Sequence, residues 1–306
     1  MKDLRIIYMG TPEFAVPSLQ ILVEQGFHIV AVITAPDKPK GRGQKLATSP
    51  VKDYAVSQEI PVLQPTNLKN PDFIEELRSY QASLQIVVAF RMLPEVVWDM
   101  PEIGTFNLHA SLLPQYRGAA PINWAIINGE KKTGVTTFFL KHEIDTGHVI
   151  FQEEETIEEA DTVGDLYPRL MEKGARLVLK TVKAIQSGDY PQLPQNEDQE
   201  IKHAPKIFKE TCEINWNKPS QAVYDFIRGL SPYPAAWTTL NGTQFKIFGA
   251  EKLDGKHVGD KPGDMDSDNK TYLHIQTGDR ALAITELQMQ GKKRMKIKDF
   301  LRGNKV

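Results

Sequence analysis

The amino-terminal part of the chain alternates short apolar, β-branched runs with longer segments of helical periodicity. The strand-sized runs lie at residues 4–9, 28–34, 84–90 and 104–108, and the helical patterns lie at 14–25, 50–58 and 71–80. Consecutive strands that are separated by helices pair in parallel through crossover connections. The alternation therefore predicts an α/β domain built on a mostly parallel sheet.

The same pattern continues further along the chain. A helix is predicted near 119–128, a strand at 133–140 and a return strand at 148–155. The segment 161–187 is helical in pattern, and Pro168 within it either begins the regular part of the helix or kinks it. We therefore expect the α/β domain to include all of these elements.

The composition changes at residues 189–206, which are polar and rich in proline, as is typical of a connection between domains. Beyond them, turn signals such as SPYP, NGT and TGD separate short β-rich runs. That spacing favours a small antiparallel barrel or sandwich. The sequence thus predicts a first domain over 1–188, a linker over 189–206 and a second, all-β domain over 207–306.

The composition of the 306 residues, 41% hydrophobic and 25% charged, is that of an ordinary globular protein. The one cysteine, Cys212, excludes an intrachain disulfide framework and any multi-cysteine metal site, which fits a reducing compartment. The longest apolar stretch is interrupted by Arg91 and Pro94 and is too short to cross a bilayer. The first residues resemble a β-strand and not a signal peptide. We therefore expect a cytoplasmic protein with no membrane partner.

The net charge of −2 is unevenly distributed along the chain. Residues 207–306 hold 16 Lys and Arg against 12 Asp and Glu, whereas residues 1–206 hold 21 against 27. A polyanion is therefore expected to bind at local basic patches. The candidates are Lys38, Lys40, Arg42 and Lys45 in the loop 36–46, and Lys292, Lys293 and Arg294 in the stretch 291–303. Each stretch alone could be an ordinary solvated surface, but together they favour a divided polyanion footprint.

Three other stretches lack the spacing of the sites that they superficially resemble. GTPEFA contains only Gly10, without the further glycines of a dinucleotide fingerprint, and the loop 36–46 lacks the spacing of a phosphate loop. In HEIDTGH, the residues His142, Asp145 and His148 are three apart and alternate faces in an extended chain. We therefore expect no metal site there. Asp145 is instead predicted in a turn between two strands.

The stretch NLHASLLPQYRG places Asn107 and His109 on one face of a strand, at its end. In an open parallel sheet, ligands bind beyond this end of the strands. Gly147 permits an unusual backbone angle, so the turn could deliver the Asp145 carboxylate toward His109. An amide, an imidazole and a carboxylate together could stabilise an oxyanion during acyl transfer, with an amine supplied by the substrate. The alternative is that Asn107 and His109 only satisfy loop backbone groups.

Several motifs together identify a family resemblance along nearly the full chain. They are GTPEFA (10–15), PDKPKGRGQKL (36–46), NLHASLLPQYRGAAPINWAIINGE (107–130), IDTG (144–147) and DFLRG (299–303). The chain resembles the methionyl-tRNA formyltransferases, a branch of the folate-dependent formyltransferase superfamily. The central motif is specific for the superfamily, whereas the first two and the last indicate the tRNA-acting branch.

The resemblance implies a Rossmann-like catalytic domain joined to a carboxyl-terminal barrel of the OB type. It implies formyl transfer from 10-formyltetrahydrofolate to the amino group of methionine on initiator tRNA. We also expect a monomer that holds no metal. The catalytic trio falls on Asn107, His109 and Asp145. The folate-contacting segment falls on Ser111, Leu112, Leu113 and Pro114. Arg42 and its basic neighbours match the loop that enters the acceptor stem, and the late basic residues would extend the tRNA footprint.

Two alternatives and one departure accompany the resemblance. A sibling enzyme that formylates a small amine, such as an amino sugar or glycinamide ribonucleotide, would share the central motif without needing the basic loop. A non-catalytic RNA-binding protein with a degenerate formyltransferase domain is the other alternative. The departure is Arg91 in FRMLP, where the family commonly carries a small or uncharged residue, so Arg91 either alters the folate pocket or forms a local ion pair.

Overall fold

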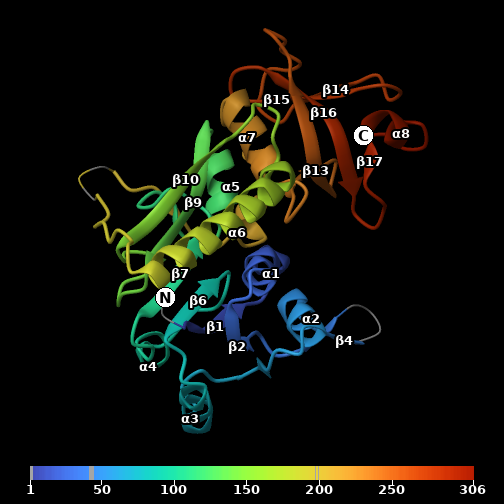
Figure 1. The fold of residues 1–306 in the computed structure, drawn as a ribbon. Helices are drawn as coiled ribbons and strands as arrows, with labels where there is room; N and C mark the ends of the chain where they lie inside the picture. The colour runs from blue at the N-terminus through green and yellow to red at the C-terminus, as the bar shows by residue number, and fades with distance from the viewer. Residues whose placement is uncertain (1–2, 41–44, 197, 199) are drawn as a thin grey trace. The chain divides into compact units, whose positions relative to one another are not determined.

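A computed structural model describes residues 3–40, 45–196, 198 and 200–306 (Figure 1). The chain divides by its contacts into two compact units that interleave in sequence. The first unit comprises Met1–Arg117, Gly134–Glu155 and Pro168–Lys202. The second unit comprises Gly118–Thr133, Thr156–Tyr167 and His203–Val306. Domain boundaries at residues 188 and 206 stay a prediction.

The first unit is built on a sheet with the strand order β10-β9-β7-β6-β1-β2-β5. Its strands are β1 (Arg5–Gly10), β2 (His28–Ile33), β5 (Val62–Leu63), β6 (Leu84–Val88), β7 (Gly104–His109), β9 (Lys132–Phe139) and β10 (Val149–Thr156). The pairs from β7 through β6, β1 and β2 to β5 are parallel, and β9 pairs with β7 in the antiparallel direction. The predicted, mostly parallel α/β sheet is confirmed.

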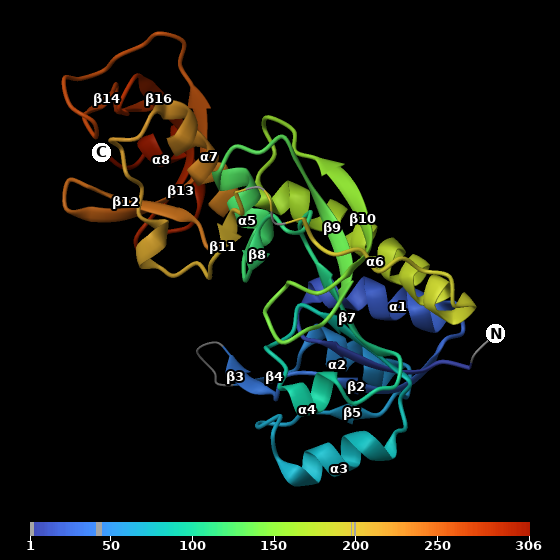
Figure 2. The same cartoon turned by 90° about the vertical axis from the view of Figure 1, so that its left-hand side faces the viewer.

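Helices cover both faces of this sheet. They are α1 (Val16–Glu24), α2 (Pro50–Ser57), α3 (Pro71–Ser79), α4 (Glu95–Trp98) and α6 (Val163–Ser187), which contains Pro168. Apolar residues of α3 and α4 pack with Met9 and Val87 of the sheet in one buried cluster. On the opposite face, α6 lies so close to β7 that a Cβ added to Gly174 would be 2.7 Å from Leu108 Cδ2. The two views in Figure 1 and Figure 2 show α3 and α6 on opposite sides of the sheet.

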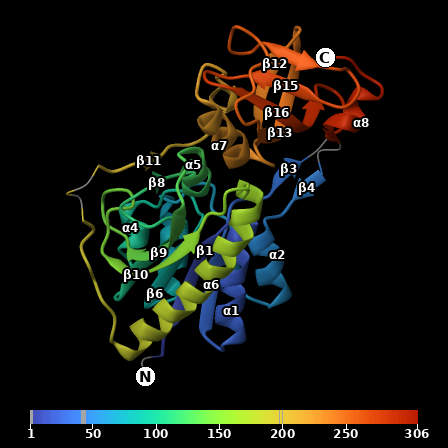
Figure 3. The ribbon, with the colours of Figure 1, turned by 90° about the horizontal axis from the view of Figure 1, so that it is seen from above.

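The carboxyl-terminal part forms an antiparallel half-barrel with the strand order β12-β13-β16-β15-β14, and β17 pairs with β16 (Figure 3). Its strands are β12 (Ala236–Leu240), β13 (Thr243–Lys252), β14 (Met265–Ser267), β15 (Leu273–Gln276), β16 (Ala281–Met289) and β17 (Met295–Lys296). The helices α7 (Ser220–Leu230) and α8 (Ile297–Leu301) contribute Ile227 and Phe300 to its core. The predicted β architecture is confirmed, and two helices are added to it.

The second unit also contains α5 (Pro121–Ile127), which packs against α7. A Cβ added to Gly229 of α7 would lie 2.6 Å from Ile127 Cγ1, so glycine is required at this crossing. Within α7, Arg228 and Asp225 form an ion pair of 2.7 Å although both side chains are buried. The pair is also hydrogen-bonded, because Gln221 Nε2 donates to Asp225 Oδ2 at 3.0 Å and Arg228 Nη1 donates to the carbonyl of Asp161 at 3.0 Å.

Short elements complete the chain. They are η1 (Glu13–Ala15), β3 (Lys38–Lys40), β4 (Lys45–Ala47), β8 (Arg117–Gly118), β11 (His203–Ala204) and η2 (Glu210–Cys212). Of the helices within the described residues, none combines the length and the apolar character that crossing a membrane requires.

Candidate active site

Asn107 and His109 lie at the carboxyl end of β7 and point to the same face of the sheet. Asn107 aligns with Val87 on one side and Phe138 on the other, while His109 aligns with Thr136. Asn107 is half-buried, and its side-chain amide makes no hydrogen bond to any residue that the structure describes. An amide with unused donors at this edge can donate to a ligand atom.

His109 is held by one ring nitrogen and faces a carboxylate with the other. Its Nε2 lies 2.8 Å from the carbonyl oxygen of Tyr116, and since a carbonyl only accepts, Nε2 carries a hydrogen and donates it. Its Nδ1 lies 3.9 Å from Asp145 Oδ2. The side chain of His109 is only 7% exposed and that of Asp145 12%. The predicted approach of Asp145 to His109 is therefore present in the structure.

The turn that carries Asp145 has an unusual backbone. Asp145 itself has a φ of 57°, in the left-handed region that aspartate tolerates better than most residues. Gly147 is required for a different reason, because a Cβ there would lie 1.5 Å from the carbonyl oxygen of Phe139. The expectation that Gly147 supplies the unusual angle is wrong, since the positive φ belongs to Asp145.

The segment from Ser111 to Pro114 is fixed by side chains from the two antiparallel strands. Thr136 Oγ1 donates to Ser111 O at 2.6 Å and accepts from Leu113 N at 3.2 Å. Gln152 Nε2 donates to Leu113 O at 2.8 Å. Ser111 is fully buried and its hydroxyl donates to Gln115 O. Leu112 is half-buried, whereas Leu113 and Pro114 are buried. Folate contact by this segment stays a prediction.

Sequence reasoning did not find four residues that shape this site. Tyr116 orients His109, Thr136 and Gln152 hold the 111–114 segment, and Gln195 donates to the backbone of the Asp145 turn. Tyr116 acts through its backbone carbonyl, so its side chain carries no signal. Gln195 lies in the predicted linker, which is polar throughout, so a glutamine there gives no indication of a role in the site. Only the strand position of Thr136, beside His109, could have indicated a role.

Arg91 follows β6 and ties its loop to the segment after β5. Its guanidinium donates to the carbonyl of Thr66 at 3.0 Å and to the carbonyl of Pro65. Burial lowers the pKa of Arg91 from its ordinary value. With the residues that the structure describes, Arg91 makes no ion pair. The local contact is therefore to backbone carbonyls and not to a carboxylate.

The polar residues of HEIDTGH have separate partners. His142 Nε2 lies 3.3 Å from Glu95 Oε1, and its ring meets Trp98 edge-on at 5.5 Å. His148 Nε2 lies 3.0 Å from Lys141 Nζ. Across 3–40, 45–196, 198 and 200–306, no group of three His, Cys, Asp or Glu side chains is placed to hold a metal ion.

The first basic stretch forms a hairpin in which β3 and β4 pair, with Lys38 opposite Ala47. Lys40 and Lys45 pair through their backbones, and Arg42 lies outside the described residues. Asp37, at the base of the hairpin, accepts from Lys52 Nζ at 2.5 Å and from Gln64 Nε2 at 2.8 Å. These hydrogen bonds, that from Lys52 foremost, hold the pKa of Asp37 below its ordinary value.

The second basic stretch lies at the turn between β16 and β17. Lys292 and Lys293 are exposed. Arg294 is also exposed, but it donates to Glu286 Oε2 at 2.7 Å and lies over the Phe248 ring at 4.3 Å. The hydrogen bond from Arg294 lowers the pKa of Glu286. Part of the positive charge of this stretch is therefore already neutralised.

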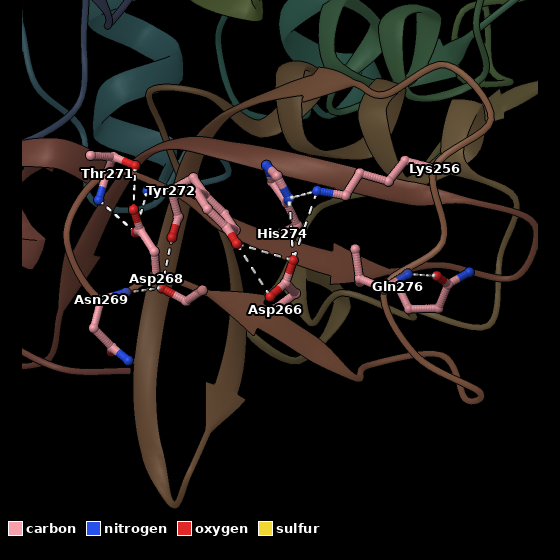
Figure 4. Close-up of polar contacts among 10 residues, drawn as sticks. Lys256, Asp266, Asp268, Asn269, Thr271, Tyr272, His274 and Gln276 are labelled. Carbon is pink, nitrogen blue, oxygen red and sulfur yellow. Dashed lines mark hydrogen bonds and ion pairs between the residues drawn. The ribbon is translucent and has the colours of Figure 1, made fainter.

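A separate polar cluster lies on the β14–β15 hairpin (Figure 4). Asp266 and His274 are opposite each other in the register, and the Tyr272 ring stacks on the His274 ring at 4.3 Å. Lys256 Nζ donates to His274 Nδ1 at 3.0 Å. Burial, together with the Lys256 charge, lowers the pKa of His274. Asp268 caps the turn by accepting from three backbone amides, so these contacts close the hairpin.

Comparisons with known proteins agree with the geometry. The family described as formyl transferase matches residues 4–182, and the family described as formyl transferase, C-terminal domain, matches residues 206–305. A methionyl-tRNA formyltransferase of Bacteroides fragilis is 57% identical over 310 residues, covering 99% of this chain and 95% of that protein. The methionyl-tRNA formyltransferase of Phocaeicola vulgatus is 59% identical over 312 residues, covering 99% and 96%.

A solved structure shares the fold at lower identity. WlaRD, a sugar 3N-formyl transferase solved in the presence of dTDP and 5-N-formyl-THF, superimposes with a TM-score of 0.68 at 22% identity, covering 96% of this chain and all of that chain. Because the family matches cover most of the chain and the two relatives share more than half of its residues, the chain belongs to the formyl transferase family, in the branch of the methionyl-tRNA formyltransferases.

Proposed function

We propose that this protein transfers the formyl group of 10-formyltetrahydrofolate to the α-amine of methionine carried by initiator tRNA. The observation that carries the proposal is 57% identity, over 99% of the chain, to a methionyl-tRNA formyltransferase. The meeting of His109 and Asp145 at the end of β7, beside Asn107, supports it with a chemical rationale. The reaction would take place in the cytoplasm, with the protein acting as a monomer.

The first step of the proposed reaction is attack of the amine on the formyl carbon. The amine must be neutral, and free α-amines titrate near about 7.7–8.0, so a useful neutral fraction exists at neutral pH. A nitrogen–carbon bond forms, and the electron pair of the formyl carbonyl moves onto its oxygen. The half-buried Asn107 amide is placed to donate to that oxygen.

His109 is proposed to act as a second donor through Nδ1. Its Nε2–H is committed to the Tyr116 carbonyl, so a hydrogen on Nδ1 as well makes the ring an imidazolium. The Asp145 carboxylate, 3.9 Å from Nδ1, stabilises that positive charge. The distance is longer than a hydrogen bond, so the Nδ1 hydrogen is not saturated by Asp145 and can be shared with the oxyanion.

The second step is collapse of the tetrahedral intermediate. The oxygen electron pair re-forms the carbonyl, and the bond between the formyl carbon and the folate nitrogen breaks. The leaving nitrogen needs a proton, and the attacking amine must lose one. We assign that transfer to Asp145, directly or through a water molecule, because its carboxylate can take up and release a proton and faces the imidazole that binds the oxyanion.

The basic stretches are proposed to bind the tRNA. Lys38, Lys40, Arg42 and Lys45 would contact the acceptor stem, and Lys292, Lys293 and Arg294 would add phosphate contacts. An acceptor stem whose first position is unpaired, as proposed for the initiator, costs less free energy to open at its end than a stem whose first position is paired. This would bring the methionyl amine to the formyl donor and favour the initiator over elongator tRNA.

A formyl-transfer assay tests the proposal with four acceptors side by side: methionyl initiator tRNA, methionyl elongator tRNA, free methionine and an amino-sugar nucleotide. We expect turnover on the initiator to exceed that on every other acceptor. The structural similarity to WlaRD, at 22% identity, shows a shared fold alone and does not favour a sugar acceptor. Preferred turnover of the amino sugar would overturn the tRNA assignment, and folate turnover on no acceptor would indicate a non-catalytic RNA-binding protein.

A further inference from the structure

Gln195 makes four hydrogen bonds with its side-chain amide, all within the first unit. Its Nε2 donates to the carbonyl of Asp145 at 2.7 Å and to the carbonyl of Gly147 at 3.0 Å. Its Oε1 accepts from Arg117 Nη2 at 2.7 Å and from Arg117 Nε at 3.1 Å. An amide has two donor hydrogens and two acceptor lone pairs, so these four contacts use its full capacity.

The two partners of Gln195 lead to the two sides of the same imidazole. Arg117 directly follows Tyr116, whose carbonyl accepts from His109 Nε2. On the other side, the Asp145 carboxylate faces His109 Nδ1 at 3.9 Å. The contacts therefore form a ring that begins at His109, passes through Tyr116, Arg117, Gln195 and Asp145, and returns to His109.

The Asp145 turn needs such support because of its backbone. A non-glycine residue in the left-handed region persists only where its surroundings fix it, and Asp145 has a φ of 57°. The two carbonyls that Gln195 holds lie on either side of Thr146, so the amide fixes the turn across its tip. Close by, the backbones of Leu193 and Val149 exchange hydrogen bonds of 2.8 and 2.9 Å, which anchors the chain that carries Gln195.

We propose that Gln195 is a positioning residue for catalysis, which sets the distance and direction of the Asp145 carboxylate relative to His109. This inference rests on the proposed function. Gln195 touches neither Asp145 Oδ2 nor the imidazole, and it acts through the backbone of the turn. A residue of the predicted linker thereby contributes to the catalytic geometry.

The first test replaces the donor while keeping the acceptor. In Gln195→Glu, the carboxylate still accepts from Arg117, but it has no hydrogen to donate to the two turn carbonyls. We expect kcat to fall by about 10- to 100-fold, since displacement of a catalytic group by about 1 Å can cost 10²-fold. The KM values for folate and tRNA and the melting temperature should stay near those of the wild-type protein.

The matched control is Gln192→Glu. Gln192 lies in the same segment, is exposed, and its side chain makes no hydrogen bond to any residue that the structure describes. The substitution introduces the same charge three positions away, so it reports any general electrostatic effect on tRNA binding. We expect its kcat to equal that of the wild-type protein.

A double-mutant cycle with Asp145→Asn separates positioning from a merely structural role. The hydrogen bond from Gln195 goes to the backbone of Asp145, so it survives in Asp145→Asn but has no carboxylate to position. In single-turnover assays, Gln195→Glu should therefore cost much less in the Asp145→Asn background than in the wild-type background. Additive losses, or wild-type kcat for Gln195→Glu, would overturn the inference. Absence of formyl transfer by the wild-type protein would instead overturn the proposed function.

Discussion

At the scale of single residues, the site depends on strand alternation and on one free amide. Asn107 and His109 project from the same face because they are two positions apart on β7. His109 is anchored through Tyr116, whereas the Asn107 amide has no hydrogen-bonding partner among the described residues. A half-buried amide with no hydrogen bond to a described residue is available to a ligand, so its removal should affect catalysis more than folding.

Replacement of Asn107 by alanine tests this directly. We expect Asn107→Ala to lower kcat by about 10²–10³, which is the usual cost of losing one oxyanion donor. The melting temperature should change little, because no hydrogen bond to a described residue is lost. The measurement is formyl transfer to methionyl initiator tRNA under saturating folate, with thermal unfolding followed in parallel.

The size-matched variant Asn107→Asp serves as the control for shape. It keeps the volume of the side chain but removes the donor and adds a negative charge beside the developing oxyanion. Its kcat should fall at least as far as that of Asn107→Ala. Near-wild-type turnover in either variant would exclude Asn107 as an oxyanion donor.

The sequence indicated the three residues that are proposed to carry the chemistry, but it did not indicate the residues that hold them in place. Asn107, His109 and Asp145 have side chains whose type and spacing indicate acyl transfer. Gln195 has an ordinary side chain, 50 positions from Asp145 and 78 from Arg117. Its contacts exist only once the chain has folded, so no local pattern could have predicted them.

At the scale of elements, periodicity predicted the long strands and helices and missed the short or disguised ones. The two-residue strand β5 is too short to show alternation. The helix α7 has buried Val223, Ile227 and Leu230 at helical spacing, but Asp225 and Arg228 are buried as well. These two charged residues interrupt the apolar pattern in the sequence, and they can be buried because they form an ion pair with each other. Gly229, which lowers helix propensity, is there because α5 passes so close.

The β3–β4 hairpin provides a prediction at this scale, because its base is tied by Asp37. We expect Asp37→Ala to raise the KM for tRNA several-fold while leaving the KM for folate unchanged, since the hairpin carries part of the proposed tRNA footprint. Hydrogen exchange at the amides of Lys38 and Lys40 should accelerate in the same variant. Lys52→Gln, which removes the other partner of the ion pair, should behave similarly.

The contribution of Asp37 to the free energy of unfolding is also predicted to depend on pH. The pKa of Asp37 in the folded protein is lower than its ordinary value of 3.8, so its contribution to stability is present above pH 3.8. That contribution is lost as the pH falls through the lower, folded-state pKa. The difference in unfolding free energy between the wild-type protein and Asp37→Ala should therefore be constant near neutral pH and shrink below pH 3.8. A difference that grows on acidification would contradict the assignment.

At the scale of the whole molecule, the sequence predicted two domains that follow one another along the chain, whereas the contacts of the folded chain define two units that are each assembled from separate segments. Each compact unit collects segments from three separate parts of the chain. The segment Gly118–Thr133 lies in sequence between β7 and most of β9, and Thr156–Tyr167 lies between β10 and most of α6, yet both join the carboxyl-terminal residues. Composition reports local changes only, so it could indicate a proline-rich connection but not this exchange of segments between the units.

The uneven charge of the chain leads to the prediction at this scale. The double variant Lys292→Ala with Lys293→Ala should weaken binding of initiator tRNA. Each lost phosphate contact should reduce the slope of log affinity against log salt by about 0.7–0.9, hence by about 1–2 in total. Folate affinity should not change. Binding is best measured by fluorescence titration over a range of salt concentrations, because the number of phosphate contacts is obtained from the slope of log affinity against log salt and not from the affinity at one salt concentration.

The charge-matched control is Lys69→Ala with Lys270→Ala. Both lysines are exposed, lie outside the two basic stretches, and have no side-chain partner among the described residues. The control changes the net charge by the same amount, so any general electrostatic attraction of the tRNA falls equally in both double variants. A steeper loss of affinity and of salt slope in the Lys292 and Lys293 variant alone would locate phosphate contacts at this turn. Equal losses in the two variants would show that these lysines contribute only through the net charge of the molecule.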